Sequence, residues 1–370
     1  MNKNYESWSV RRSPDDFNNL ETKEKLKYLC LLAHLAPSSH NTQPWRFFID
    51  ESSPSITVYL DRKFVLPASD VDGRQALVSV GCAIENLICS AAYFGFKSTT
   101  ELLTANNNTA KPFSESESRL TPLAKITVKK TEPNIDLEKI RLAIFNRKII
   151  RAEYDPQKQI PENILQSIQN FADGEIAKLH IITDGIRKLG IAEFQAQADG
   201  FVINSPKFSK ELGDWLLPNN TDSFMGMPGI GFGLLDDQAL RMHRGLLGET
   251  PLQPEDGLKF ATAGKIGLEK SPAIAVITTK KDDMEHWIAA GRLFERIFLE
   301  LTSRGICVAM HAGITEVALI KKIFSMTFGT MRHVTVLFRM GYAKNENDAL
   351  RPHTPRLPLS EVIITDKPSL

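Results

Sequence analysis

The sequence contains an internal repeat, in which one predicted helix recurs 210 residues further along the chain. Around Gly81, apolar residues recur at the spacing of one helix face, and Gly95 follows where the helix is expected to end. The second copy lies around Gly291 and ends before Gly305. The other matched positions are Val80 and Ala290, Ile84 and Phe294, Glu85 and Glu295, Leu87 and Ile297, Ile88 and Phe298, and Ala91 and Leu301. Two copies of one helix predict a chain built from a duplicated unit.

Other segments support two halves of similar plan, each with a helix, a strand, a core helix and a later strand. The expected elements are 22–35, 46–50, 78–95 and 124–130 in the first half, and 161–172, 177–183, 288–304 and 333–341 in the second. Helices and strands alternate without a regular β-α-β rhythm, so the predicted class is α+β. We place the first half at residues 1–135 and the second at 136–370.

The second half is expected to carry an insertion at about residues 185–265. Its central part, 215–248, concentrates glycines among Met and Phe residues, a composition that suits a mobile apolar cover over a site. The run Gly229–Gly233 does not predict a dinucleotide-binding loop, because no hydrophobic strand precedes it.

Composition excludes several classes of protein. Lys and Arg number 45 and Asp and Glu 44, which leaves no basic excess to hold nucleic acid or an anionic membrane surface. No run of about 18 apolar residues predicts a membrane span. Cys30, Cys82, Cys89 and Cys307 lack metal-ligand or CxxC spacing, so we expect buried reduced thiols and no metal site. These features predict a cytoplasmic protein that acts on a small molecule.

The segment Ala36–Phe47 places short polar side chains on a turn between a helix and a strand. Ser38, Ser39, Asn41 and Gln43 can hydrogen-bond a flat heteroaromatic ligand there. The alternative is an ordinary polar loop that ends a helix, with prolines as breakers. A second polar string, 146–154, contains Arg147, Lys148 and Arg151. Three cations suit a phosphate group, although such clusters are also found simply solvated on surfaces.

The string Ala36–Phe47 resembles the signature of the nitroreductase-like flavoproteins, in which it follows the first long helix and lines the FMN site. This resemblance implies that Ser38, Ser39, Asn41 and Gln43 form the flavin cradle. It also implies that Arg147 contacts the FMN phosphate, that Lys148 follows it, and that Arg151 approaches the N1 and O2 edge of the ring. The usual Ser or Thr after the second basic residue is Ile149 in this chain.

Two further strings resemble parts of the same family. The segment 354–359 is similar to the closing segment, where Arg356 matches a cation over the phosphate and Thr354 stands in place of another. The segment 309–313 matches a stretch whose backbone lies against the flavin ring with an amide aimed at N5. This match implies cofactor contacts from Met310, His311, Ala312 and Gly313. Judged from the residues alone, a lone His311 after an apolar helix is more often a structural hydrogen-bonding residue than a catalyst.

The two halves have lost complementary parts of the family pattern. The first half keeps the cradle but has Asp15 where the flavin-facing cation belongs. The second half keeps the cations, but residues 171–178 stand in place of its cradle. The whole length, the Gly-rich insertion and the segment Asp72–Arg74 make the chain look most like the Acg-type FMN-binding branch, in which a fused chain mimics a homodimer. This resemblance implies one composite FMN site within each chain, whether or not the protein self-associates further.

In this family the flavin carries the chemistry, so no side chain is expected to act as a catalytic residue. Three function classes follow from the resemblance. The first is an FMN-dependent oxidoreductase that takes hydride from NAD(P)H and reduces a planar acceptor such as a quinone or a nitroaromatic. The second is an FMN-sequestering protein whose lid excludes substrates. The third is a specialised flavin-using enzyme, such as the flavin-fragmenting or azoline-oxidising relatives.

Overall fold

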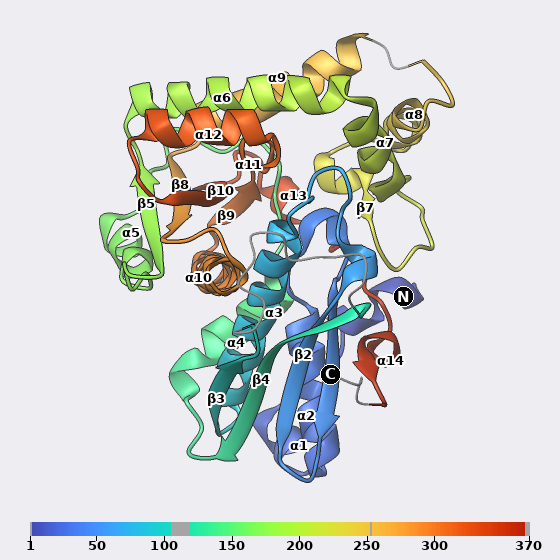
Figure 1. Ribbon diagram of the computed structural model, residues 1–370, viewed down its shortest axis with the longest axis vertical. Helices are drawn as coiled ribbons and strands as arrows, with labels where there is room; N and C mark the ends of the chain where they lie inside the picture. The colour runs from blue at the N-terminus through green and yellow to red at the C-terminus, as the bar shows by residue number, and fades with distance from the viewer. Residues whose placement is uncertain (1, 105–117, 252–253, 367–370) are drawn as a thin grey trace.

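The computed structural model describes residues 2–104, 118–251 and 254–366, which form two sheets with helices between and around them (Figure 1). The first sheet has the order β11-β1-β2-β4-β3. Its strands are β1 (Trp45–Asp50), β2 (Ser55–Asp61), β3 (Phe96–Leu102), β4 (Leu120–Lys130) and β11 (Ile363–Ile364). Neighbouring strands are antiparallel, except that β11 from the end of the chain pairs in parallel with β1.

The second sheet has the order β5-β8-β10-β9 and is antiparallel. Its strands are β5 (Ala177–Ile182), β8 (Ala273–Thr279), β9 (Cys307–Met310) and β10 (His333–Gly341). In both sheets the first and second strands in chain order are neighbours, and the fourth lies between the second and the third. Helices α3 (Arg74–Tyr93) and α10 (Met284–Ser303) occupy the same place between the second and third strands. The predicted class, α+β with two duplicated halves, is therefore confirmed.

Helices α3 and α10 pack against each other through the glycines of the repeat. A Cβ atom on Gly81 would overlap the carbonyl oxygen of Ile288, and one on Gly291 would overlap that of Val78. Glycine therefore lets the two backbones approach closely where the helices cross. Gly95 and Gly305, which follow the two helices, have φ values of 80° and 70°. This left-handed conformation ends a helix and favours glycine.

An insertion separates β5 from β8, at the place where residues 51–54 form a short turn between β1 and β2 in the first half. It is mostly helical, which the sequence analysis did not predict. Its elements are α6 (Gly185–Asn204), α7 (Pro206–Trp215), β6 (Leu216–Leu217), β7 (Met227–Pro228), η5 (Gly229–Phe232), α8 (Asp236–Leu246) and α9 (Pro254–Lys270). Helices α6 and α9 run along the top of the molecule in Figure 1, with α7 and α8 beside them.

The remaining elements connect or cover the two sheets. They are η1 (Lys3–Trp8), α1 (Pro14–Asn18), α2 (Thr22–His34), η2 (Ser39–Asn41), η3 (Arg62–Phe64), η4 (Ile135–Leu137), α4 (Glu138–Asn146), α5 (Glu162–Gln169), α11 (Gly313–Glu316), α12 (Ala318–Phe328), α13 (Glu346–Ala349) and α14 (Leu359–Val362).

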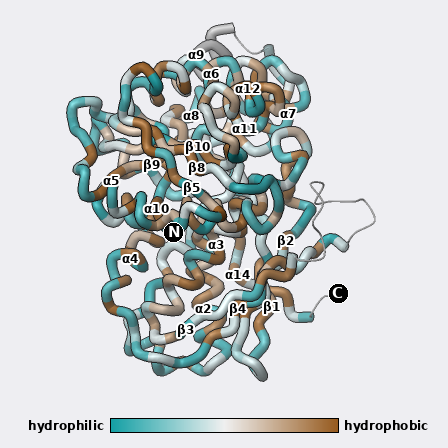
Figure 2. The backbone as a smooth tube through the Cα atoms, turned by 60° about the vertical axis from the view of Figure 1, so that its left-hand side comes forward, coloured by the Kyte–Doolittle hydropathy of each residue, from teal (hydrophilic) through white to brown (hydrophobic). Residues whose placement is uncertain are grey.

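The apolar segments of the chain lie in the interior, with the strands of the second sheet among the most hydrophobic (Figure 2). Within the described ranges, α3 is the one helix long and apolar enough to cross a membrane by length and composition. However, 89% of its apolar window is buried in the fold, as expected for a core helix. All four cysteines are free thiols, and Cys30, Cys82 and Cys89 are buried.

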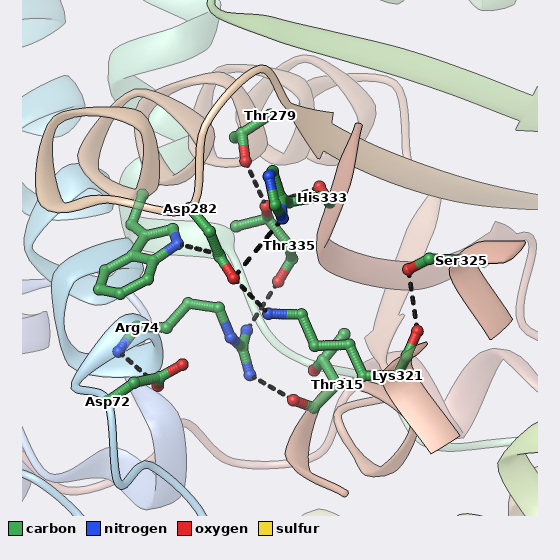
Figure 3. A network of polar contacts seen from close by, with 10 residues as sticks. Asp72, Arg74, Thr279, Asp282, Thr315, Lys321, Ser325, His333 and Thr335 are labelled. Atoms are coloured by element: carbon green, nitrogen blue, oxygen red, sulfur yellow. Dashed lines mark hydrogen bonds and ion pairs between the residues drawn. The ribbon is translucent and has the colours of Figure 1, made fainter. Parts of the chain in front are cut away.

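A polar network joins the start of α3 to the second half (Figure 3). The Arg74 guanidinium is buried and donates to the carbonyl oxygens of Thr335 at 2.7 Å and Thr315 at 3.0 Å. Nearby, Asp282 accepts from the Trp287 indole at 2.7 Å and pairs with Lys321 at 3.2 Å. Through Arg74 the network links α3 of the first half to β10 and α11 of the second.

Candidate functional site

A cavity of about 590 Å³ lies between the two halves and the insertion. Its volume falls within the range of about 300–1,000 Å³ that is usual for small-molecule sites. Of the residues predicted from the sequence, eleven line it: Ser38, Ser39, Asn41, Arg147, Lys148, Arg151, Met310, His311, Ala312, Gly313 and Arg356. Gln43, which was also predicted, lies behind the wall and is fully buried.

The cradle turn is held in an unusual backbone conformation. His40, Asn41 and Gln43 have φ values of 48°, 56° and 50°, a region that residues other than glycine seldom adopt. The Ser38 hydroxyl accepts a hydrogen bond from the Gln43 amide at 3.0 Å, and the Ser39 hydroxyl donates to Gln75 of α3 at 2.7 Å. Strained backbone of this kind persists only where its surroundings enforce it, and it is common at functional sites.

The amides of Asn41 and Gln43 hold other parts of the chain around the cavity. Asn41 donates to the carbonyl oxygens of Gly226 at 3.0 Å and Pro355 at 2.9 Å. Gln43 donates to Phe224 at 2.9 Å and accepts from the Leu357 amide at 2.9 Å. The cradle therefore anchors both the insertion and the C-terminal segment, a role that the sequence analysis did not anticipate.

Two buried arginines cap the C-terminal end of α2. Arg356 donates to the carbonyl oxygens of His34 at 3.1 Å and Ala36 at 2.9 Å, and to the Asn41 side chain at 2.6 Å. Arg147 donates to the carbonyl oxygen of the intervening Leu35. The last carbonyls of a helix carry partial negative charge, so both cations are stabilised there.

The same end of the cavity includes Trp8, an aromatic residue that sequence reasoning missed. The Trp8 ring stacks on His353 with centroids 4.0 Å apart, and its indole donates to the Thr354 carbonyl at 2.9 Å. The Arg356 guanidinium lies 4.7 Å from the centroid of the Trp8 ring. Only the fold brings these N-terminal and C-terminal residues together, so no local motif could have revealed them.

Arg151 is the least compensated cation in the cavity. Its guanidinium lies 4.3 Å from the centroid of the Phe232 ring, in the insertion. It makes no hydrogen bond or ion pair with any residue in the ranges that the structure describes. Burial, with Arg339 nearby, lowers the pKa of Arg151 to about 10, so the group is still charged at neutral pH. A buried cation without a partner is costly unless a ligand supplies negative charge.

Several other buried polar atoms at the cavity have no hydrogen-bond partner in the described chain. They are His40 Nδ1, Arg147 Nε, His311 Nε2, Arg339 Nε, Arg351 Nη1 and His353 Nδ1. Burial lowers the pKa of His40 to about 4 and that of His311 well below its usual value, so both imidazoles are neutral at pH 7. Because buried polar groups in folded proteins almost always find partners, this set fits a ligand rich in polar atoms.

The place related to this cavity by the repeat is occupied by side chains. In the cavity region Glu295 pairs with Arg147 at 3.5 Å, whereas its counterpart Glu85 pairs with Arg292 at 3.2 Å and Arg296 at 3.7 Å. Arg296 also lies 5.4 Å from the centroid of the Phe171 ring, in the segment that stands in place of a second cradle. Arginines from α10 thus pair with Glu85 in the place where Arg147 pairs with Glu295.

The insertion supplies a wall that no sequence motif predicted. It contributes apolar side chains, Val202, Phe208, Leu212 and Met242, and polar ones, Gln195, Asp199, Glu211 and Gln238. These residues are spread over three helices and come together only in the fold. Within the described residues, no group of three or more His, Cys, Asp or Glu side chains is arranged to hold a metal ion.

The chain is similar over most of its length to proteins named as nitroreductases. The chain is 22% identical over 353 residues to a Mycobacterium tuberculosis protein named "Putative NAD(P)H nitroreductase acg", a match that spans 93% of this chain and 97% of that protein. It is 25% identical over 341 residues to "Putative NAD(P)H nitroreductase Rv3131" of the same organism, covering 92% and 91% of the two chains. A crystal structure of a "putative nitroreductase" from Anabaena variabilis matches with a TM-score of 0.49 and 10% identity, over 93% of this chain and 92% of that one. No family model matches.

The sequence relatives extend over almost the whole chain and carry the nitroreductase name. They confirm the resemblance to the nitroreductase-like superfamily. Among them, the match to the Acg protein covers almost the full length of both chains.

Proposed function

We propose that the protein is an FMN-dependent oxidoreductase that takes hydride from NAD(P)H and reduces a planar acceptor such as a quinone or a nitroaromatic. The observation that carries this proposal is Arg151, a half-buried cation in a cavity built from both halves of the chain, with no hydrogen bond or ion pair among the described residues. The N1 and O2 edge of a flavin ring, which becomes negative on reduction, is a ligand that such a cation would stabilise.

The residues present suit each part of FMN. Arg147, Lys148 and Arg356 would hold the phosphate. Arg147 Nε makes no hydrogen bond and only the 3.5 Å ion pair with Glu295, and among the described residues Lys148 contacts one carbonyl oxygen at 3.4 Å. Ser38, Ser39 and Asn41 would line the ring on one side, and the segment Met310–Gly313 would line it on another. When bound, FMN would supply the hydride-transfer chemistry. The protein would position it, stabilise its negative charge and keep water away.

We further propose that one chain forms one complete site. The cradle comes from the first half and the cations from the second, while Arg292 and Arg296 fill the related place. Self-association would then be unnecessary for cofactor binding, although it is not excluded by this arrangement. Buried free thiols at Cys30, Cys82 and Cys89 support a reducing compartment, the cytoplasm.

One observation favours the second candidate function, FMN sequestration. The cover formed by the insertion is tied down by three amide side chains of the first half. Asn4 donates to the carbonyl oxygens of Thr221 at 3.2 Å and Ser223 at 3.0 Å, and Asn41 and Gln43 hold Gly226 and Phe224. A cover held at four carbonyls would retain FMN and slow the entry of an acceptor.

The test is reconstitution of the purified protein with FMN, followed by NAD(P)H oxidation with a quinone acceptor. We expect one FMN per chain and turnover with quinone. Tight FMN binding without turnover would favour sequestration. Failure to bind FMN, or binding of two equivalents, would contradict the composite site.

A further inference from the structure

The insertion places a carboxyl group, that of Asp199 on α6, in the cavity wall. Asp199 is 8% exposed. Its Oδ1 accepts a hydrogen bond from the Gln195 side chain of the same helix at 2.7 Å. Its Oδ2 has no hydrogen bond or ion pair with any described residue and lies against Gly264 of α9, where a Cβ atom would come within 2.5 Å. One of the two carboxyl oxygens, Oδ2, thus has no hydrogen-bond partner among the described residues.

Asp199 adjoins the segment that is proposed to face the flavin ring. A Cβ atom on Gly313 would lie 2.8 Å from Asp199 Oδ1 and 2.7 Å from Gln195 Nε2. Gly313 directly follows Met310, His311 and Ala312 in the cavity lining. The carboxyl group therefore lies beside the place where hydride transfer is expected, and a side chain at position 313 would displace it.

The charged groups around Asp199 form hydrogen bonds with other residues. Glu211 of α7 accepts from the Ala68 amide at 2.7 Å and from the Ser69 amide and hydroxyl at 3.0 and 2.6 Å. Glu316 of α11 accepts from Gln75 at 3.2 Å, and Arg74 of α3 is bound to two backbone carbonyls. Arg241 of α8 also lines the cavity and has contacts of its own. No cation pairs with Asp199 in the described chain.

These surroundings keep a proton on the group near neutral pH. Burial raises the pKa of Asp199 to about 7, and the hydrogen bond from Gln195 opposes this only in part. Burial likewise raises the pKa of Glu316 to about 7, with Asp199 and Glu211 contributing. A separate observation also indicates a ligand here: His311 is 9% exposed, lines the same cavity, and its Nε2 has no partner.

We propose that Asp199 donates a proton to the acceptor during its reduction, an inference that rests on the proposed function. Reduction of a quinone to a hydroquinone takes up two electrons and two protons. A hydride that originates from NAD(P)H brings both electrons and one proton. The O–H bond of Asp199 breaks as an O–H bond forms on the acceptor oxygen, and the carboxylate regains a proton from water. A general acid is most effective when its pKa is near the working pH.

The test is a comparison of Asp199→Asn with a matched control, Asp214→Asn, on the neighbouring helix. Asp214 is exposed and pairs with Lys210 on the surface, so its replacement removes a carboxylate without touching the cavity. FMN in each protein is reduced with dithionite, and its reoxidation by a quinone is followed by stopped flow. We expect Asp199→Asn to slow reoxidation on the order of a hundred-fold, within the usual range for general acids. Asp199→Glu should recover part of the rate.

The proton itself gives a readout that does not depend on turnover. In the FMN-free protein, an infrared band of a protonated carboxyl group should be present at pH 6 and lost by pH 8, and Asp199→Asn should remove it. Glu316 also has a pKa of about 7, so Glu316→Gln is needed to distinguish its infrared band from that of Asp199. Reoxidation of Asp199→Asn at the wild-type rate with an unchanged pH profile would overturn the proposal. If the wild-type protein binds FMN but NAD(P)H does not reduce that FMN, the result would contradict NAD(P)H as the reductant and leave the role of Asp199 to be decided by the reoxidation rates.

Discussion

Replacing Gly81 with alanine should destabilise the protein by forcing α3 and α10 apart. The added methyl group would overlap the Ile288 carbonyl oxygen and come within 3.0 Å of the Arg292 amide nitrogen. Both are backbone atoms, which cannot rotate away as a side chain does. Overpacking of this kind costs about 1–3 kcal/mol, whereas alanine in a helix interior gains about 1 kcal/mol over glycine. Since the clash is with backbone, we take the upper cost and expect a net loss of roughly 2 kcal/mol.

Gly190→Ala provides the control, because Gly190 lies in the interior of α6 and a Cβ atom there meets nothing within 4 Å. This variant should be as stable as the wild type or gain up to about 1 kcal/mol. The measurement is the free energy of unfolding of the FMN-free protein in urea. FMN affinity should also fall in Gly81→Ala, since the cavity lies between the halves that these helices join. If the Gly81→Ala protein were as stable as the Gly190→Ala protein, the inference that the α3 and α10 backbones require glycine at their crossing would be refuted.

Three further predictions concern the cavity. Arg151→Ala should weaken FMN binding by about 1.5–3 kcal/mol, the contribution of a hydrogen bond from a charged group, while Arg11→Ala should leave binding unchanged. Fluorescence titration measures the affinity of both variants, and equal effects would contradict the role assigned to Arg151. Asn4→Ala removes two of the bonds that hold the cover, so dithionite should reduce bound FMN faster; an unchanged rate would argue against gating. Burial raises the pKa of Asp199 in the folded protein above its value in the unfolded chain. The folded state therefore favours the protonated carboxyl group, and the stability that goes with it is fully present below about pH 4 and is lost as the pH rises towards 7. Urea unfolding between pH 5 and pH 8 should therefore show a steeper loss of stability in the wild type than in Asp199→Asn.

The repeat predicted the elements that form the middle of each half. The strand expected at 333–341 is β10, and those expected at 46–50 and 177–183 match β1 and β5 within one residue. Both core helices begin four residues before the predicted start, because the turns at Gly73 and Asp283 precede the apolar repeat. Strands β2 and β8 were not predicted. Every residue in each is buried, so neither shows the alternation that marks a strand with one exposed face.

The cavity was only partly foreseeable. Its cations and its serines lie in continuous strings, which a resemblance can identify from sequence. Asp199, Glu211 and Phe208 lie in helices where a buried polar or aromatic residue has no distinctive neighbours. Their position depends on how the insertion folds back over the second sheet, and this is a property of tertiary packing. The engagement of Asn41 and Gln43 with the insertion is of the same kind.

The pairing of β11 with β1 bears on the order in which this chain completes its fold. Strands β1 and β2 are synthesised long before Ile363 and Ile364, which pair with the edge of β1, and before Arg356, which caps the last carbonyls of α2. Until Ile363 and Ile364 have been made, this edge of the first sheet is open, and an open edge is a site for pairing with other chains. The first half is therefore made early and completed last. A truncation that removes only the final residues should expose the nascent N-terminal sheet to aggregation, even though the missing segment belongs to the other half.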